Sequence, residues 1–349
     1  MEIKDRDDDL KKSDQELLEE EYERREDGLD KPGKRLRLKE LYSKKSDLVL
    51  KKGRVLEIFS KNYFRVKLEN EEITCPLTGR LKIVDFGQRS MVVVGDYVYV
   101  DVSQEPRIEE IAERKNSLKR YIDKGKQQLK VDLAANIDQV IITGSCSEPP
   151  LNLNLVDRYL CAAQLSEIVP VVCINKTDLA GNLDQIKQQC SYYESVDIQV
   201  VYTSAATGEG IDELKDVLFA KDSVFSGVSG TGKSSLINKL DPELELKTSE
   251  VSKASLKGKH TTSSSKLIPW SFGGYLTDTP GIKTFGLNKN DRFEIPRIFP
   301  GFDNWVMSCK FSNCNHIHEA GCRVLRALKT GELPEERYQS YLNILSSLE

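Results

Sequence analysis

The chain has 349 residues, which at about 150 residues per domain is enough for two or three domains with a sizeable core. It is 39% hydrophobic and 30% charged, a composition that excludes collagen-like, low-complexity and wholly disordered chains. No run of residues approaches the roughly 18 apolar positions of a membrane-spanning helix, and the first ten residues, MEIKDRDDDL, lack the apolar core of a signal peptide. We therefore expect a cytoplasmic, multidomain protein that does not associate with membranes.

Charge is unevenly distributed near the amino terminus. Residues 1–30 hold 14 Asp or Glu and 6 Lys or Arg, whereas residues 31–54 hold 10 Lys or Arg and 2 acidic residues. Because highly charged, aromatic-poor runs are typical of solvated tails, we expect residues 1–47 to form a charged, disordered extension. The basic block fits either an ordinary solvent-exposed face or an arm that neutralises nucleic-acid phosphates.

From Leu48 to about Ile111, apolar and polar residues alternate with a period of two, which is typical of short strands. The pattern predicts strands at Gly53–Ile58, Tyr63–Leu68, Glu72–Pro76, Val92–Val102 and Arg107–Ile111. Since closure removes exposed sheet edges, we expect residues 48–115 to form a small β-barrel of the oligonucleotide-binding (OB) type, with an SH3-like barrel as the alternative. The basic residues that flank it favour an RNA-facing surface.

From about Ala134 onward, predicted strands and helices alternate. The strands are Gln139–Thr143, Ile168–Ile174, Ile198–Tyr202, Val224–Phe225, Leu267–Trp270 and Tyr275–Thr277; the helices are Leu153–Glu167, Leu183–Tyr193, Ile211–Phe219 and Lys233–Leu240. This α/β pattern predicts a parallel sheet covered on both faces, with a ligand at the carboxyl ends of the strands. The last 60 residues are predicted to be helical.

A phosphate-binding loop lies between the fourth of these strands and the helix Lys233–Leu240. The segment comprises Gly227, Val228, Ser229, Gly230, Thr231, Gly232, Lys233, Ser234 and Ser235, and it fits the pattern G-x-x-x-x-G-K-[ST]. Its glycines allow backbone N–H groups to converge on phosphate oxygens at the start of a helix. Lys233 is expected to reach the β- and γ-phosphates and Ser234 to ligate Mg²⁺.

A second sequence element indicates which nucleobase the protein binds. Asn175-Lys176-Thr177-Asp178 follows a buried strand and resembles the NKxD element of guanine-nucleotide-binding proteins. That resemblance implies that Asp178 accepts hydrogen bonds from guanine, that Asn175 braces a neighbouring loop and that the Lys176 stem lies along the ring. Ser204 and Ala205, after the next strand, are similar to the partner element whose backbone amide meets guanine O6.

Two further segments complete the pattern. Asp278-Thr-Pro-Gly281 resembles the DxxG element, which implies that Asp278 holds Mg²⁺ through water and that the Gly281 amide faces the γ-phosphate. The segment 258–262, GKHTT, lies where a GTPase keeps its switch I threonine, which is Thr261 or Thr262, with family resemblance favouring Thr262. In a Ras-like chain these phosphate elements precede NKxD, whereas here they follow it. The sequence therefore predicts a circularly permuted P-loop GTPase domain at residues 116–288.

A Cys/His cluster lies near the carboxyl terminus. Cys309, Cys314, His316 and Cys322 suit a closed, tetrahedral and structural Zn²⁺ site, and His318 is a competing fourth ligand. We therefore expect residues 289–349 to form a zinc-binding helical domain. The remaining cysteines are expected to be small buried hydrophobic residues, not disulfide partners.

A barrel, a permuted GTPase and a Cys/His cluster together resemble the RsgA family of small-ribosomal-subunit-dependent GTPases, also called YjeQ. The resemblance covers about residues 48–349 and rests on AANID (134–138), NKTD, GVSGTGKSS, GKHTT, DTPGIKTFGL, the cluster and EERY (335–338). It implies an enzyme that hydrolyses GTP to GDP, binds the small ribosomal subunit and its rRNA late in maturation, and is released after hydrolysis. Nothing in the sequence suggests more than a monomer.

Ile282 occupies the position after DxxG where Ras-like enzymes carry a water-orienting Gln. Because an isoleucine side chain cannot hydrogen-bond water, the isolated enzyme is expected to be slow. The resemblance implies that His260 positions the water, beside Lys233 and Thr262; the alternative is that His260 is only an exposed switch residue.

Two other classes of function remain open at this point. One is a GTP-dependent protein that binds another RNA, such as a tRNA or a messenger. The other is an RNA-binding zinc protein with a vestigial GTPase, against which the intact Lys233, Ser234 and Asp278 argue. Because the chain runs directly from the DxxG segment into the zinc domain, loss of the γ-phosphate is expected to reposition that domain.

Overall fold

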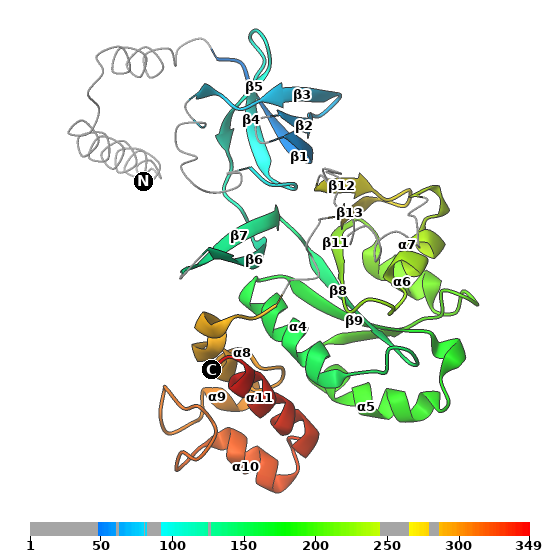
Figure 1. The fold of residues 1–349 in the computed structure, drawn as a ribbon, viewed down its shortest axis with the longest axis vertical. Coiled ribbons are helices and arrows are strands. Elements are labelled where there is room, and N and C mark those ends of the chain that lie inside the picture. The colour runs from blue at the N-terminus through cyan, green and yellow to red at the C-terminus, as the bar shows by residue number, and fades with distance from the viewer. Residues whose placement is uncertain are drawn as a thin grey trace, which may run out of the picture. The chain divides into compact units, whose positions relative to one another are not determined.

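The computed structural model describes residues 48–60, 63–79, 81, 92–124, 127–244, 265–278 and 286–349 (Figure 1). Leu50–Glu349 form one compact unit. The predicted extension 1–47, the switch I residues His260, Thr261 and Thr262, and Gly281 lie outside the described residues. Within the described ranges, no helix is both long enough and apolar enough to cross a lipid bilayer.

The amino-terminal barrel is built from five strands: β1 (Leu50–Ser60), β2 (Tyr63–Lys67), β3 (Glu72–Pro76), β4 (Tyr97–Asp101) and β5 (Arg107–Ile111). β1 pairs antiparallel with both β2 and β4, β2 pairs with β3, and β4 pairs with β5. A bridge between Leu77 and Ile108 brings the chain after β3 beside β5. The ring order β1-β2-β3-β5-β4 is that of an OB barrel and not of an SH3-like barrel, so the OB prediction is supported.

The predicted strand Val92–Val102 is too long. The structure begins β4 at Tyr97, because Gly95 has a φ of +89° and the Asp96 carboxylate accepts a hydrogen bond from the Val93 amide at 2.8 Å. This turn interrupts the ladder. Val94, on its amino-terminal side, instead forms an isolated bridge with Ala134 and is fully buried.

A hairpin that the sequence analysis did not predict follows the barrel. β6 (Ser117–Lys124) and β7 (Gln127–Ala135) pair antiparallel as a separate two-stranded sheet. A weak signal was present, because Leu129, Val131 and Leu133 alternate with polar residues. The signal was obscured because these two segments contain four Lys or Arg residues and few turn residues.

The central sheet carries five parallel strands in the order β10 (Gln199–Tyr202), β9 (Val169–Asn175), β8 (Gln139–Ser145), β11 (Lys221–Ser226) and β13 (Gly274–Asp278). Next to β13 lies β12 (Lys266–Pro269), which is antiparallel to it. The predicted parallel sheet is therefore confirmed, except that β12 is antiparallel to its neighbour β13. β12 also pairs with β1 through Glu57 and Lys266, so the ladder continues from the GTPase sheet into the barrel.

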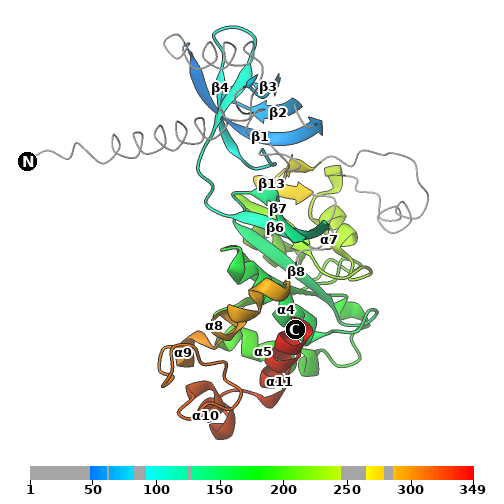
Figure 2. The ribbon, with the colours of Figure 1, turned by 60° about the vertical axis from the view of Figure 1, so that its left-hand side comes forward.

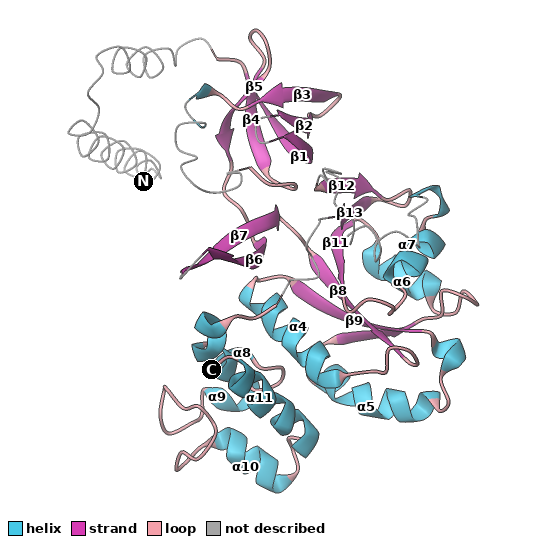
Figure 3. Cartoon of the chain, in the orientation of Figure 1, coloured by secondary structure: helices cyan, strands magenta, loops and turns pink. Residues whose placement is uncertain are grey.

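Four helices cover this sheet: α4 (Leu153–Leu165), α5 (Leu183–Ser195), α6 (Ile211–Leu218) and α7 (Lys233–Leu240). Alternate residues of β8 point to opposite faces, so Val140 and Ile142 pack in the core with α4 and α5, whereas Ile141 packs in the core with α6 and α7. Figure 3 shows the two helix pairs on opposite sides of the strands. The predicted covering of both faces is confirmed.

The carboxyl-terminal region is helical, as predicted. Its helices are α8 (Ile295–Ile298), α9 (Asp303–Val306), α10 (Arg323–Thr330) and α11 (Glu335–Ser347), and the 3₁₀ turn η4 (Lys289–Phe293) precedes them. Two other 3₁₀ turns, η1 (Thr177–Leu179) and η2 (Pro242–Leu244), lie in the GTPase domain. Gly331, with a φ of +78°, ends α10, and α11 begins after Pro334. One face of α11 is buried, and Tyr341, Ile344 and Leu345 lie on it.

A buried polar network fastens α11 to the GTPase domain. The ribbon shows α11 beside α4 (Figure 2). The Arg337 guanidinium donates to the Asp157 carboxylate of α4 and to the Tyr193 hydroxyl of α5, both at 2.8 Å. The Tyr193 hydroxyl donates in turn to Asp157 at 2.8 Å. Burial raises the pKa of Asp157, and the charge of Arg337 opposes that rise. These charges are stable inside the protein because each one has its partner.

Candidate nucleotide-binding and metal sites

The predicted nucleotide elements lie at the carboxyl ends of neighbouring parallel strands. The phosphate-binding loop follows β11, the NKTD segment ends β9 and continues into η1, Ser204 follows β10, and Asp278 is the last residue of β13. Since β10, β9, β8, β11 and β13 are adjacent and parallel, these segments meet at one edge of the sheet.

The glycines of the phosphate-binding loop are required by its backbone. Gly227, Gly230 and Gly232 have φ values of +139°, +89° and +92°. A Cβ at Gly227 would lie 2.4 Å from the Thr143 carbonyl oxygen, and one at Gly232 would lie 2.3 Å from the Asn175 Nδ2 atom. The loop can therefore curl tightly over β8 only without side chains at these positions.

Lys233 is folded back onto its own loop. Its ammonium donates to the carbonyl oxygens of Gly227 at 2.8 Å and Val228 at 2.7 Å. Lys233 is the first residue of α7, and Ser234 follows it, half-buried, in the first turn, while Ser229, Gly230 and Ser235 are exposed. The loop thus presents a cation, a hydroxyl and a helix amino terminus together, which is the chemistry that phosphate binding requires.

Asn175 joins the phosphate-binding loop to the base-side loops. Its Nδ2 atom donates to the Thr231 carbonyl at 2.9 Å, while its Oδ1 atom accepts from the Ala205 amide at 3.2 Å and the Thr203 hydroxyl at 3.3 Å. The side chain is buried, and these partners engage both its amide nitrogen and its amide oxygen. One side chain therefore connects segments that lie 56 and 30 residues away in the chain.

Asp178 is exposed at the rim of this edge, and its carboxylate accepts a hydrogen bond from the Ser204 hydroxyl at 2.5 Å. Lys176 has a left-handed backbone, with a φ of +64°, and its ammonium donates to the Glu148 carbonyl. Thr177 is tied to the neighbouring loop through the Glu209 carboxylate, at 3.2 Å. The sequence analysis missed Glu209, whose backbone carbonyl also accepts from the Ser204 amide at 2.9 Å.

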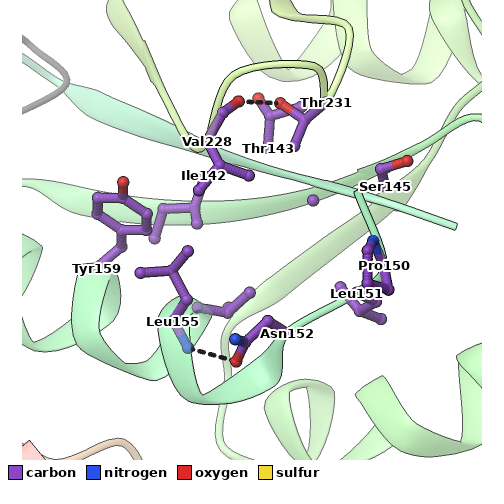
Figure 4. Close-up of a pocket in the computed structure, with 12 residues that line it drawn as sticks. Ile142, Thr143, Ser145, Pro150, Leu151, Asn152, Leu155, Tyr159, Val228 and Thr231 are labelled. Carbon is purple, nitrogen blue, oxygen red and sulfur yellow. Dashed lines mark hydrogen bonds between the residues drawn. The ribbon is translucent and has the colours of Figure 1, made fainter. Parts of the chain in front are cut away.

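A small cavity of about 30 Å³ lies beneath the phosphate-binding loop, between the end of β8 and the start of α4 (Figure 4). Val228 and Thr231 of the loop line it from above, and Asn152 and Leu155 line it from α4. This volume holds a water molecule or two and excludes a nucleotide. The cavity therefore marks the packing of the loop on α4 and is not itself a nucleotide pocket.

The Cys/His cluster is brought together as predicted. The ligand atoms of Cys309, Cys314, His316 and Cys322 all lie within 4.8 Å of one another. His316 Nδ1 lies 3.3 Å from the Cys322 sulfur and 3.7 Å from the Cys309 sulfur. A tetrahedral zinc ion with ordinary bond lengths separates such S and N ligands by about 3.6 Å, so the residues fit the metal. His318 is exposed and stands outside this group.

The orientation of His316 is fixed by its other ring nitrogen. His316 Nε2 lies 3.1 Å from the Pro296 carbonyl, which leaves Nδ1 directed at the thiols. Burial lowers the pKa of His316, which favours the neutral imidazole that binds metals. From α11, the hydroxyls of Tyr338 and Tyr341 donate to the backbone carbonyls of His316 and Asn315 at 2.8 and 2.6 Å.

Glu319 is a functional residue of this loop that the sequence analysis missed. Its carboxylate accepts backbone hydrogen bonds from Asn315 at 2.8 Å, Ile317 at 2.9 Å and His318 at 3.1 Å. Its pKa is about 2, since these hydrogen bonds outweigh the opposing effect of burial. The only signal in the sequence was an acidic residue inside a short turn between two ligands.

The fold and the site define a class of protein. A phosphate-binding loop, an NKxD-type turn and a Ser-Ala loop meet at one edge of a parallel sheet, and the base-side elements precede the phosphate-binding loop in the chain. This is a circularly permuted P-loop GTPase. The family model described as RsgA GTPase matches residues 111–288. The chain belongs to the RsgA GTPase family and is a GTP hydrolase, as its sequence predicted.

Similar proteins extend this relationship over most of the chain. The small ribosomal subunit biogenesis GTPase RsgA of Christiangramia forsetii is 36% identical over 296 residues, which cover 82% of this chain and 94% of the relative. The same-named protein of Thermotoga maritima is 34% identical over 305 residues, with coverage of 86% and 97%.

Two solved structures have the same fold. The crystal structure of YjeQ from Thermotoga maritima matches with a TM-score of 0.70 at 33% identity and covers 86% of this chain and 99% of that one. The structure of YloQ, described as a circularly permuted GTPase, matches with a TM-score of 0.64 at 27% identity and covers 86% and 95%. The predicted fold class is confirmed.

Proposed function

We propose that this GTPase acts in the cytoplasm, as a monomer, in late maturation of the small ribosomal subunit, and that hydrolysis of GTP drives its release. The relatives that match more than four-fifths of the chain are small ribosomal subunit biogenesis GTPases. The structural observation that carries the nucleotide-binding part of the proposal is the Asn175 side chain, which connects the phosphate-binding loop with the loops expected to hold guanine.

Residues 227–235 are the phosphate site in this proposal. The Lys233 ammonium exchanges the Gly227 and Val228 carbonyls for β- and γ-phosphate oxygens, which are stronger partners because they are charged. Ser234 and Asp278 hold Mg²⁺, with Thr262 completing its shell. When bound, Mg²⁺ neutralises charge on the phosphates. The Gly281 amide faces the γ-phosphate.

Asp178 selects guanine because its carboxylate accepts two hydrogen bonds from donors that adenine does not present together. The Ser204 hydroxyl, which donates to Asp178 at 2.5 Å, holds that carboxylate in place, and the Ala205 amide meets guanine O6. The Lys176 stem lies along the ring, and Thr177 fixes the turn. His260 orients the attacking water, since Ile282 has no polar atom for that purpose.

Cys309, Cys314, His316 and Cys322 hold one Zn²⁺ with a structural role. Three thiolates and one imidazole leave no open position for a substrate. The surrounding loop has little core of its own, so the metal supplies much of its folding energy.

The barrel presents a surface suited to rRNA. Cations and aromatic rings alternate from the barrel to β13. Lys52 lies 5.0 Å from the Tyr97 ring, Arg54 lies 5.2 Å from both Tyr97 and Tyr275, and Lys67 lies 5.9 Å from Tyr275. Lys52 and Lys67 are exposed, so they can bind phosphates, and bases can stack beside the rings. The Arg54 side chain is only 12% exposed and pairs with Asp222, so it orders the two tyrosines and does not contact RNA.

The test is the GTPase rate of the purified protein alone and with small subunits, large subunits or tRNA. Small subunits should raise the rate by at least about tenfold, and the other two should not. Lys67→Gln should reduce this stimulation while the basal rate stays unchanged, and Lys187→Gln, an exposed lysine over the Tyr202 ring, is the matched control. Equal stimulation by tRNA would favour a different RNA partner, and no stimulation would refute the ribosomal assignment.

A further inference from the structure

Three charged side chains stand in a row where the barrel ladder meets the GTPase sheet. Glu57 of β1 is the partner of Lys266 of β12, and Lys266 is the partner of Asp278 of β13. Directly opposed residues of antiparallel strands lie on the same face with Cβ atoms about 5 Å apart. Lys266 is therefore flanked by two carboxylates, one on the barrel and one on the GTPase strand.

The lysine is held on the barrel side. Its ammonium lies 2.7 Å from a Glu57 carboxylate oxygen, and the Arg65 guanidinium pairs with the other oxygen. The Glu57 side chain is only 4% exposed, whereas that of Lys266 is 44% exposed. A buried carboxylate needs its cations more than an exposed one does, so Glu57 competes well for the ammonium.

Two residues of this row, Lys266 and Asp278, adjoin the segments expected to contact the γ-phosphate and Mg²⁺. Asp278 ends β13 and begins the DTPG segment, and Lys266 begins β12 directly after the segment that contains GKHTT. The pairing extends to the backbone, because the Ile58 amide donates to the Ser265 carbonyl at 3.4 Å. The barrel strand thus pairs with β12 and also contacts β13, because Arg54 lies over the Tyr275 ring.

We propose that Glu57 is a positioning residue for GTP hydrolysis, which holds the Lys266 ammonium away from Asp278 and so leaves the Asp278 carboxylate available to magnesium-bound water. Without Glu57, the lysine turns across the hairpin to Asp278 and competes with the metal. The inference rests on the proposed role of Asp278.

The test compares Glu57→Gln with the parent protein. The readout is the dissociation constant of Mn²⁺, used in place of Mg²⁺, for the complex with a non-hydrolysable GTP analogue, measured from the electron paramagnetic resonance signal of free Mn²⁺. A cross-strand pair of opposite charge changes an equilibrium constant by up to about fivefold, so the dissociation constant should rise by about three- to fivefold. The Mg²⁺ concentration for half-maximal GTPase activity should rise in parallel, while KM for GTP at saturating Mg²⁺ stays unchanged.

A second substitution separates this effect from simple damage to the junction. In Glu57→Gln/Lys266→Met the competing ammonium is absent, so Mn²⁺ affinity should return to the parental value or exceed it. Lys266→Met alone should likewise not weaken Mn²⁺ binding. Glu72→Gln removes an exposed carboxylate 3.8 Å from Arg65 without contact to Lys266, and it is the matched control.

The outcomes distinguish this inference from the function on which it rests. If Asp278→Asn weakens Mn²⁺ binding and Glu57→Gln does not, the positioning role of Glu57 is wrong and the role of Asp278 stands. If the double variant binds Mn²⁺ as weakly as Glu57→Gln, the effect is structural and the inference is refuted. If Asp278→Asn itself leaves Mn²⁺ affinity unchanged, the proposed magnesium site is wrong.

Discussion

Replacing Arg337 by methionine should destabilise the protein strongly, because it removes the cation from a buried network. The Arg337 side chain is 7% exposed and that of Asp157 is 0% exposed, so water cannot take over the lost interaction. Removing one partner of a buried ion pair costs about 3–5 kcal/mol of unfolding free energy. Since the Tyr193 hydroxyl still donates to Asp157 at 2.8 Å, we expect a loss near the lower end, about 3 kcal/mol.

The loss should depend on pH. Burial raises the pKa of Asp157, and Arg337 opposes this, so the variant has a still higher pKa in the folded protein. When the pKa of a carboxyl is higher in the folded than in the unfolded protein, the free energy of unfolding decreases as the pH rises through the folded pKa. The difference between variant and parent should therefore be largest at neutral pH and should shrink on acidification, when Asp157 is neutral in the variant.

The assay is urea unfolding of the zinc-loaded protein at pH 7.5 and pH 5.5, followed by circular dichroism. Arg326→Met, on the exposed side of α10, is the matched control and should change stability by less than about 0.5 kcal/mol. The variant Arg337→Met/Asp157→Asn should be more stable than Arg337→Met, since no charge is left buried. A loss below about 1 kcal/mol, or one independent of pH, would refute this account of the network.

Three other substitutions test the two sites. Asp178→Asn should weaken GTP binding by about 100-fold, as expected for the loss of charged hydrogen bonds, and fluorescent-nucleotide titration measures it; unchanged affinity would contradict the assignment of guanine. Gly232→Ala should lower the thermal midpoint and nucleotide affinity together, because its Cβ would lie 2.3 Å from Asn175 Nδ2 at a φ of +92°; normal affinity would show that this approach is not needed. Glu319→Gln should destabilise the metal loop by about 1–2 kcal/mol after allowance for solvent screening, seen as several-fold faster zinc release to a chelator. The Glu319 pKa falls from 4.5 to about 2 on folding, so this difference should persist above pH 4.5 and shrink only as the pH falls towards 2; equal release rates at pH 7 would contradict it.

Elements tied to local chemistry could be predicted from the sequence. The helix Lys233–Leu240 and the strands Glu72–Pro76 and Arg107–Ile111 have the predicted bounds. In each case the signal is local: a glycine loop before a helix, or alternation between turn residues. The metal cluster is of the same kind, because four ligands within 14 residues leave few alternatives.

Features that depend on distant partners could not be predicted. The β6–β7 hairpin is stabilised by pairing across a charged sequence. The start of β4 within Val92–Val102 is set by a turn at Gly95, which packs against the Ala135 carbonyl. The three hydrogen bonds of Glu319 depend on the path of the metal loop. Likewise, the Glu57–Lys266 pair follows from a strand register between residues 209 positions apart. The roles of His260 and Thr262 stay predictions.

The way the zinc domain is fastened restricts how it can respond to the nucleotide. The chain that follows Asp278 leads into this domain, which was the reason to expect it to move when the γ-phosphate is lost. Yet α11 bonds to the metal loop through Tyr338 and Tyr341, and to α4 through Arg337, so the loop and α4 are coupled by one helix. Because the start of α4 lines the cavity beneath the phosphate-binding loop, packed elements as well as the chain connect that loop with the zinc domain. A nucleotide-dependent displacement of the domain must therefore carry α4 with it or break the Arg337–Asp157 pair, and the second course costs several kcal/mol.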